Sequence, residues 1–113
     1  MTPITTHVLD TAIGKPAALV PVGLFRLVGG AEVWLGHAVT DEDGRARDLG
    51  TGWGLEVGTY RIRFDVAEYF LRSGRSIYFY PEVVIDFRIS DLASHYHIPL
   101  LLSPFGYSTY RGS

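Results

Sequence analysis

The sequence contains no cysteine, which excludes a disulfide scaffold, a zinc–thiolate site and a thiol nucleophile. It also contains no apolar run of about 18 residues, so no membrane-spanning helix is predicted. Lys15 is the only lysine, the arginines are scattered, and the net charge is −2. Because there is neither a basic patch nor a basic amphipathic helix, we expect no nucleic-acid partner and no membrane partner.

The length and the N-terminus suggest a simple organisation. The 113 residues fit a single domain over residues 1–113, and a hydrophobic content of 47% is enough for a core without disulfides. The first residues, MTPITTHVLD, lack the basic and apolar regions of a secretory signal. We therefore expect a cytoplasmic protein.

Glycine and proline recur about every ten residues, a spacing typical of an all-β sandwich or barrel. Strands are predicted over residues 4–12, 19–28, 32–40, 59–66, 81–89, 94–103 and 107–112, with at most one short strand in the glycine-rich segment 46–58. Pro21 predicts an edge or a bulge at the start of its strand. One short helix is predicted over 67–75, ending at Gly74. These elements predict two packed sheets.

The tripeptide HYH at 95–97 places two histidines on one face of a strand, because residues two apart point the same way. Tyr96 and the apolar residues after it take the opposite, core-facing side. Two interpretations remain for the histidines. They are either surface or hydrogen-bonded side chains, or a two-point metal ligand set whose third ligand comes from His7 or His37.

Two further residues are candidates for chemistry. His7 lies in mid-strand with Thr5 and Leu9 on its face, a position that is more often structural than catalytic. Arg45 follows an Asp-Gly turn, where it is either solvated or available to clamp a planar anion or carbonyl. No G-x-S-x-G elbow, phosphate loop or dinucleotide fingerprint is present. The residue patterns alone therefore predict a β-sandwich and leave its function undetermined.

Five segments spread from end to end nevertheless resemble the 5-hydroxyisourate hydrolases, the transthyretin-related enzymes of urate breakdown. The segments are THVLDTAIGKPA (6–17), VTDEDGRARDL (39–49), GTYRIRFDVAEYF (58–70), FYPEVVIDF (79–87) and HYHIPLLLSPFGYSTYRGS (95–113). The final YRGS is the most specific of these motifs. Phe105 stands where many members of the family have tyrosine.

The resemblance implies an all-β, transthyretin-like (prealbumin-like) sandwich of two four-stranded sheets with one short helix. It implies a homotetramer, a dimer of dimers with active sites between the dimers. The implied reaction is hydrolysis of 5-hydroxyisourate to 2-oxo-4-hydroxy-4-carboxy-5-ureidoimidazoline in purine degradation, with no cofactor and no metal. The implied catalytic residues are His7, Arg45 and His97, and the implied substrate-binding residues are Ser108, Tyr110, Arg111, Gly112 and Ser113.

On this resemblance we hypothesise that His7 and His97 share the activation of water, and either of them is the base. Like-charge repulsion within the cluster keeps an imidazole neutral, and Arg45 stabilises the oxyanion. The C-terminal tetrapeptide forms the floor and wall of the pocket, so that its length matters. The alternatives are a transthyretin-like small-ligand (hormone) carrier, a metal-dependent hydrolase that uses the HYH histidines, and an interaction module without turnover.

Overall fold

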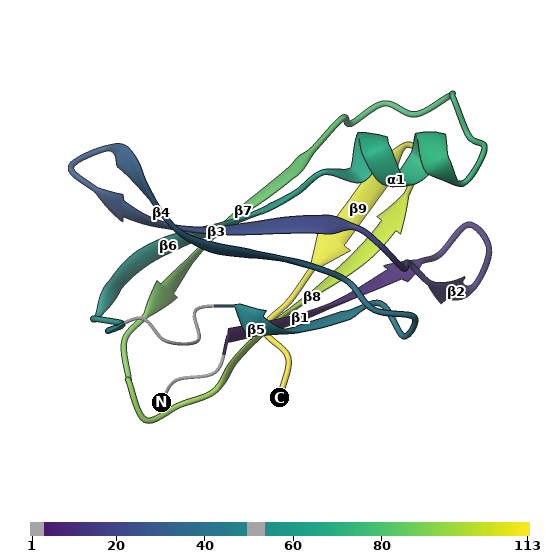
Figure 1. Cartoon of the computed structure of the whole chain (residues 1–113). Helices are drawn as coiled ribbons and strands as arrows, with labels where there is room; N and C mark the ends of the chain where they lie inside the picture. The colour runs from purple at the N-terminus through teal and green to yellow at the C-terminus, as the bar shows by residue number, and fades with distance from the viewer. Residues whose placement is uncertain (1–3, 50–53) are drawn as a thin grey trace.

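The computed structural model describes residues 4–49 and 54–113, which form two β-sheets packed face to face (Figure 1). The first sheet contains β1 (Ile4–Asp10), β2 (Lys15–Pro16), β5 (Arg45–Leu49), β8 (Tyr96–Ser103) and β9 (Gly106–Thr109). The second contains β3 (Pro21–Val28), β4 (Ala31–Val39), β6 (Gly58–Phe64) and β7 (Val83–Ile89). The predicted sandwich is confirmed.

Alternation along the strands builds the core between the sheets. Tyr60, Ile62 and Phe64 of β6 are fully buried. The core-facing residues predicted for β8 are buried as well, and they are Tyr96, Ile98, Leu100 and Leu102. Each of these sets leaves its intervening residues on the outer face of its sheet, because a strand has a period of two. The outer face of the first sheet therefore carries the side chains that the core does not use.

The helix α1 (Val66–Arg72) begins and ends as its flanking residues predict. The side chain of Asp65 caps its N-terminus by accepting a hydrogen bond from the backbone N–H of Glu68. Gly74 follows the last turn with a φ of 84°, a left-handed conformation that glycine adopts without steric cost. The side chain of Tyr69 then joins α1 to the end of β1, because its hydroxyl donates to the buried carboxylate of Asp10.

Two details of the strands differ from the sequence-based predictions, and a third agrees with them. The first sheet has five strands, because the short β2 pairs with Leu9 and Asp10 while β5 pairs with the beginning of β1. Pro21 was wrongly assigned to an edge or a bulge: it is the first residue of β3, which lies between β4 and β6. In the ambiguous segment 46–58, the strand is β5, and residues 50–53 lie outside the described residues.

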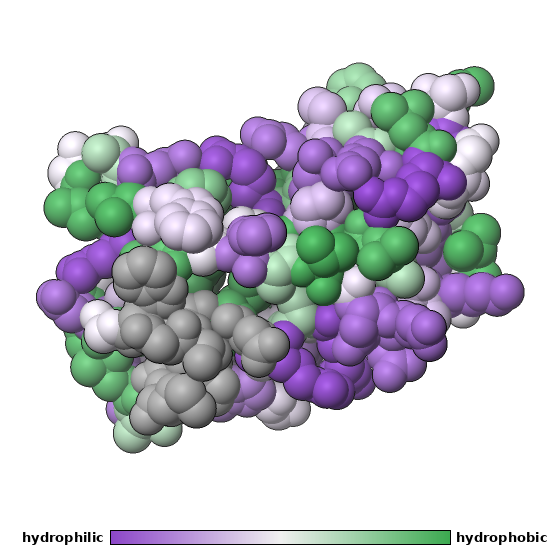
Figure 2. Space-filling model, viewed as in Figure 1, coloured by the Kyte–Doolittle hydropathy of each residue, from purple (hydrophilic) through white to green (hydrophobic). Residues whose placement is uncertain are grey.

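The surface view shows hydrophilic side chains gathered over the end of the molecule that carries the β1–β2 and β4–β5 turns, with hydrophobic groups in separate patches (Figure 2). No helix among the described residues is long and apolar enough to cross a membrane.

Candidate active site

The outer face of the first sheet holds a pocket with a volume of about 350 Å³. Its lining residues come from β1, from β5, from β8 and the residue before it, and from the C-terminal segment: Thr5, Thr6, Arg45, Arg47, His95, His97 and Ser113. Figure 1 shows the C-terminal segment running from β9 past β1 and β5, which brings Ser113 to this face. Residues from both ends of the described chain thus meet in one cavity.

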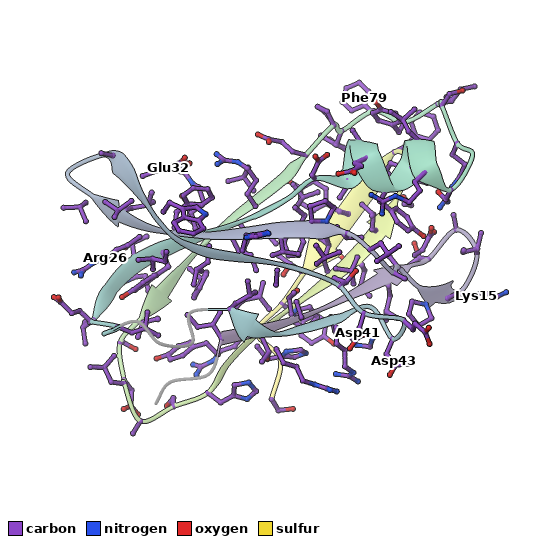
Figure 3. The ribbon with its side chains drawn as sticks, viewed as in Figure 1. Lys15, Arg26, Glu32, Asp41, Asp43 and Phe79 are labelled. Carbon is purple, nitrogen blue, oxygen red and sulfur yellow. The ribbon has the colours of Figure 1, made fainter. Side chains whose placement is uncertain are left out.

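A tight turn between β4 and β5 places Arg45. The carboxylate of Asp41 accepts hydrogen bonds from the backbone N–H groups of Asp43 and Arg45, at 2.9 and 3.0 Å, and these bonds lower the pKa of Asp41. Gly44 has a φ of 76°, and a β-carbon there would overlap the carbonyl oxygen of Val8, so only glycine fits. Asp41 and Asp43, labelled at the lower right of Figure 3, mark this turn between β4 and β5. β5 then starts with Arg45 opposite His7 of β1.

Parallel pairing of β1 with β8 places Thr5 beside His97. The Thr5 hydroxyl lies 2.8 Å from Nδ1 of His97 and 2.9 Å from Nε2 of His95, within hydrogen-bonding distance of both. The two imidazole rings have centroids 6.1 Å apart. His97 is half-buried and His95 is exposed. One hydroxyl therefore connects the two histidines predicted to share an outward face.

The surroundings of His97 favour its neutral form. Burial lowers its pKa below the ordinary value of 6.5, and the positive charges of His95, Arg45 and His7 lower it further. Like-charge repulsion thus acts as predicted, although burial has the larger effect. At neutral pH this imidazole is uncharged and able to accept a proton.

The C-terminal segment pairs with β8 at His97. The backbone N–H of Gly112 donates to the carbonyl oxygen of His97 at 2.9 Å, forming an isolated β-bridge. A β-carbon on Gly112 would overlap Cδ2 of the His97 ring and lie 3.2 Å from Pro99. The guanidinium of Arg111 stacks on the Tyr96 ring at 4.6 Å. The expected close approach of Gly112 is therefore present, and its neighbour in the chain is Ser113.

Other residues of the implied site lie elsewhere in this single chain. Tyr110 and Arg111 line a second cavity, of about 300 Å³, between the C-terminal segment and β7. His97 borders both cavities. Ser108 lies on β9, paired with Leu101, and is exposed. His7 faces outward beside Arg45 but is not among the residues that line the pocket.

Besides the buried Thr6, three lining residues received no role in the implied metal-free hydrolysis: Thr5, Arg47 and His95. Each lies two positions from an implied catalytic residue on the same strand or its direct extension. Because residues two apart share a face, the period that placed His95 beside His97 also finds Thr5 beside His7 and Arg47 beside Arg45.

The metal alternative lacks a ligand set in the part of the chain that the structure describes. No group of three or more histidine, aspartate or glutamate side chains there is arranged to hold a metal ion. His37, named as a candidate third ligand, lies on β4 in the opposite sheet. His95 and His97 instead share the hydroxyl of Thr5.

The model of the HIUase/Transthyretin family matches residues 4–112. The chain belongs to this family. It is 51% identical to the 5-hydroxyisourate hydrolase of Caulobacter vibrioides, over the full length of both chains.

Solved structures of the family share its fold. The 5-hydroxyisourate hydrolase of Klebsiella pneumoniae has a TM-score of 0.86 and 36% identity, with all of both chains covered. Transthyretin from Sparus aurata has a TM-score of 0.90 and 29% identity, covering 99% of this chain and 97% of that one. The fold is thus transthyretin-like and does not by itself separate the family's hydrolases from its transthyretins. The identities group the chain with the hydrolases, and it is an enzyme.

Proposed function

We propose that this protein hydrolyses 5-hydroxyisourate to 2-oxo-4-hydroxy-4-carboxy-5-ureidoimidazoline, a step of urate degradation. The observation that carries the proposal is the pocket on the first sheet, where His97, Arg45 and Ser113 converge in a chain 51% identical to a hydrolase of that name. A carrier of hydrophobic ligands has no need of a neutral imidazole beside a guanidinium. A hydrolase needs both, for proton transfer and for charge stabilisation.

The proposed reaction begins with water activated by the histidines. An imidazole takes a proton from water, and the hydroxide attacks a carbonyl carbon of the substrate ring. The amide C–N bond then breaks, and the proton passes to the leaving nitrogen. His97, with its lowered pKa, is able to accept the proton, and His7 lies near enough to Arg45 to share this work. A positioned general base contributes about 10²- to 10⁴-fold in rate.

Arg45 is proposed to hold the substrate and to stabilise the oxyanion that forms on the attacked carbonyl. Its guanidinium presents planar, paired N–H donors that match a planar ring with carbonyl groups. Asp41 and Gly44 hold the turn before it, so the side chain starts from a well-defined backbone position. Gly112 and Ser113 are proposed to close the pocket beside His97.

We also propose the homotetramer, assembled as a dimer of dimers. β7 and β9 are the outer strands of the two sheets on one side of the sandwich, and unpaired strand edges favour pairing with another chain. Large exposed aromatic side chains lie on and beside β9: Phe79, Phe105, Tyr107 and Tyr110. Phe79 projects from the loop beyond α1 in Figure 3. Assembly would also give Ser108, Tyr110 and Arg111 a neighbouring subunit to contact. Light scattering at micromolar concentration tests it.

The function is tested by the ultraviolet decay of freshly generated 5-hydroxyisourate. The protein is compared with buffer alone, because the substrate also decays unaided, and with His97→Ala. His37→Ala is the matched control, since His37 is an exposed histidine on the opposite sheet. We expect accelerated decay that is lost only in His97→Ala. Decay at the buffer rate by folded protein, checked by circular dichroism, would contradict the proposal and favour the carrier, to be tested with hormones and planar aromatics.

A further inference from the structure

Thr5 is the only link that the described residues provide between the imidazole nitrogens of His95 and His97. We propose that Thr5 and His95 are positioning residues that set the tautomer of His97, so that a proton on His95 turns off the base at His97. This inference rests on the proposed hydrolysis, because it assigns His97 the role of base. The chain of hydrogen bonds from His95 through Thr5 to His97, on the outer face of the first sheet, is called the relay below.

The relay follows from the hydrogen-bonding capacity of a hydroxyl. Thr5 has one O–H proton to donate, and it lies 2.8 Å from Nδ1 of His97 and 2.9 Å from Nε2 of His95. In the arrangement that uses the hydroxyl proton between the rings, Thr5 donates to one imidazole and accepts from the other. In that arrangement the position of the proton on one imidazole sets its position on the other.

Consider first a neutral His95 that accepts the Thr5 proton at Nε2. The hydroxyl oxygen is then the acceptor for His97, which must carry its proton on Nδ1. Nε2 of His97 is left with a lone pair. Arg45 lines the same pocket, and its positive charge favours a lone pair over an N–H on that nitrogen. In this arrangement Nε2 is able to take a proton from water.

Now consider a protonated His95, in which both ring nitrogens carry protons. Its Nε2–H donates to Thr5, and the proposal requires that the hydroxyl then donates its own proton to Nδ1 of His97. A neutral His97 then holds its proton on Nε2, which no longer accepts one. The base is thus turned off by the tautomer alone. The orientation of His97 therefore depends on whether His95 carries a proton.

The titratable side chains that surround the pair are basic among the described residues, and the terminal carboxylate of Ser113 belongs to the same pocket. The basic side chains are His7 from β1, Arg45 and Arg47 from β5, and Arg111, whose guanidinium donates to the carbonyl oxygen of His95. Charge on His95 opposes charge on His97, as the lowered pKa of His97 shows. The two histidines therefore titrate as a coupled pair.

The tautomer is measured directly by nitrogen-15 NMR of histidine-labelled protein without substrate, in which N–H correlations distinguish an Nδ1 proton from an Nε2 proton. At pH 8 we expect His97 to carry its proton on Nδ1. Thr5→Val, which keeps the shape and removes the hydroxyl, should shift the population toward Nε2–H, and Thr5→Ser should restore Nδ1–H. A wild-type His97 with its proton on Nε2 at pH 8, or a tautomer unchanged in Thr5→Val, would overturn the proposal.

Kinetics supply the second readout. Thr5→Val should lower kcat for 5-hydroxyisourate by about tenfold or more, part of the 10²- to 10⁴-fold that a positioned base contributes, while Thr5→Ser retains most of it. His95→Gln, which cannot become charged, should move the acid limb of the kcat profile to lower pH. His37→Gln should leave that limb in place. An acid limb unchanged in His95→Gln would overturn the relay.

The two readouts separate this proposal from the proposed function. If the wild-type protein does not turn over 5-hydroxyisourate, the proposed function fails, and the NMR experiment still decides whether Thr5 and His95 control the His97 tautomer. If turnover is present but the tautomer ignores Thr5, the relay alone fails.

Discussion

The backbone of Gly112 lies directly against the imidazole of His97. Its N–H donates to the carbonyl oxygen of His97 at 2.9 Å, and a β-carbon at position 112 would overlap Cδ2 of the ring. On its other edge the same ring meets the hydroxyl of Thr5. The imidazole therefore lies between β1 and the C-terminal segment and contacts both.

Gly112→Ala should displace the ring of His97 and lower kcat for 5-hydroxyisourate, because a shift of about 1 Å in a reacting group costs up to about 10²-fold. The matched control is Gly106→Ala, whose β-carbon would lie 3.9 Å from Oγ of Ser103, an ordinary contact. We expect the control to keep its activity and both variants to melt near the wild-type temperature. A wild-type rate in Gly112→Ala would show that the ring tolerates displacement.

Arg45→Lys should lower the rate by about 10²- to 10³-fold, the usual loss for one donor to a developing oxyanion. An ammonium is a point charge and does not reproduce the paired donors of a guanidinium. Arg72→Lys is the control, because Arg72 lies on the exposed face of α1, paired with Glu68. Near-full activity of Arg45→Lys in the ultraviolet assay would rule out the proposed clamp.

Acid should weaken the fold through His97. Its pKa in the folded chain lies below 6.5, so above pH 6.5 both folded and unfolded chains hold the ring neutral and the contribution is constant. As the pH falls below 6.5, the unfolded chain takes up a proton that the folded chain resists, and stability is lost. Urea unfolding between pH 7 and 5 should therefore show a shallower loss in His97→Gln than in wild type.

His37→Gln serves as the control for this titration, because His37 is exposed on β4. Identical slopes in wild type and His97→Gln would contradict the assigned direction of the pKa shift. The rate should fall over the same range, since a protonated imidazole is no base. A rate that stays flat from pH 5 to 8 would argue against any histidine base.

Residues added after Ser113 should impair turnover while the fold survives. Ser113 lines the pocket, so a short extension would enter or cross it. Inserting the same residues between Gly29 and Gly30, in the exposed turn of the β3–β4 hairpin, is the control, because nothing lies within 4 Å of a β-carbon at either position. A fully active protein with an extended C-terminus would mean that Ser113 does not bound the substrate.

Arg75→Met should destabilise the protein by about 3–5 kcal/mol, because it leaves the fully buried carboxylate of Asp10 without its cation. Burial raises the pKa of Asp10, but hydrogen bonds from Arg75 and Tyr69 outweigh it and hold the pKa below 3.8. Arg72→Met, which removes an exposed pair with Glu68, should cost about 1 kcal/mol or less. Urea unfolding at pH 7 measures both. Equal losses in the two variants would show that Asp10 is satisfied without Arg75.

Much of the fold can be predicted from local patterns of the sequence. The alternation of Tyr60, Ile62 and Phe64 predicted both the strand and its buried face, because a side chain every second residue must lie on one side of a strand. The helix was placed within a few residues, since Gly74 ends it within a single turn. The edge or bulge predicted from Pro21 was wrong, because the cost of its missing N–H depends on which strands lie beside it.

By itself, then, the sequence determined most of the strands, the shared outward face of His95 and His97, and, through its motifs, the family. Tertiary structure alone decided that Thr5 hydrogen-bonds to His97, that Gly112 closes on the same ring, and that Tyr110 lies in a different cavity from Arg45. These relations join residues far apart in the chain. They depend on the order and register of the strands, which arise from packing of the whole sheet and have no signature in any local run of residues.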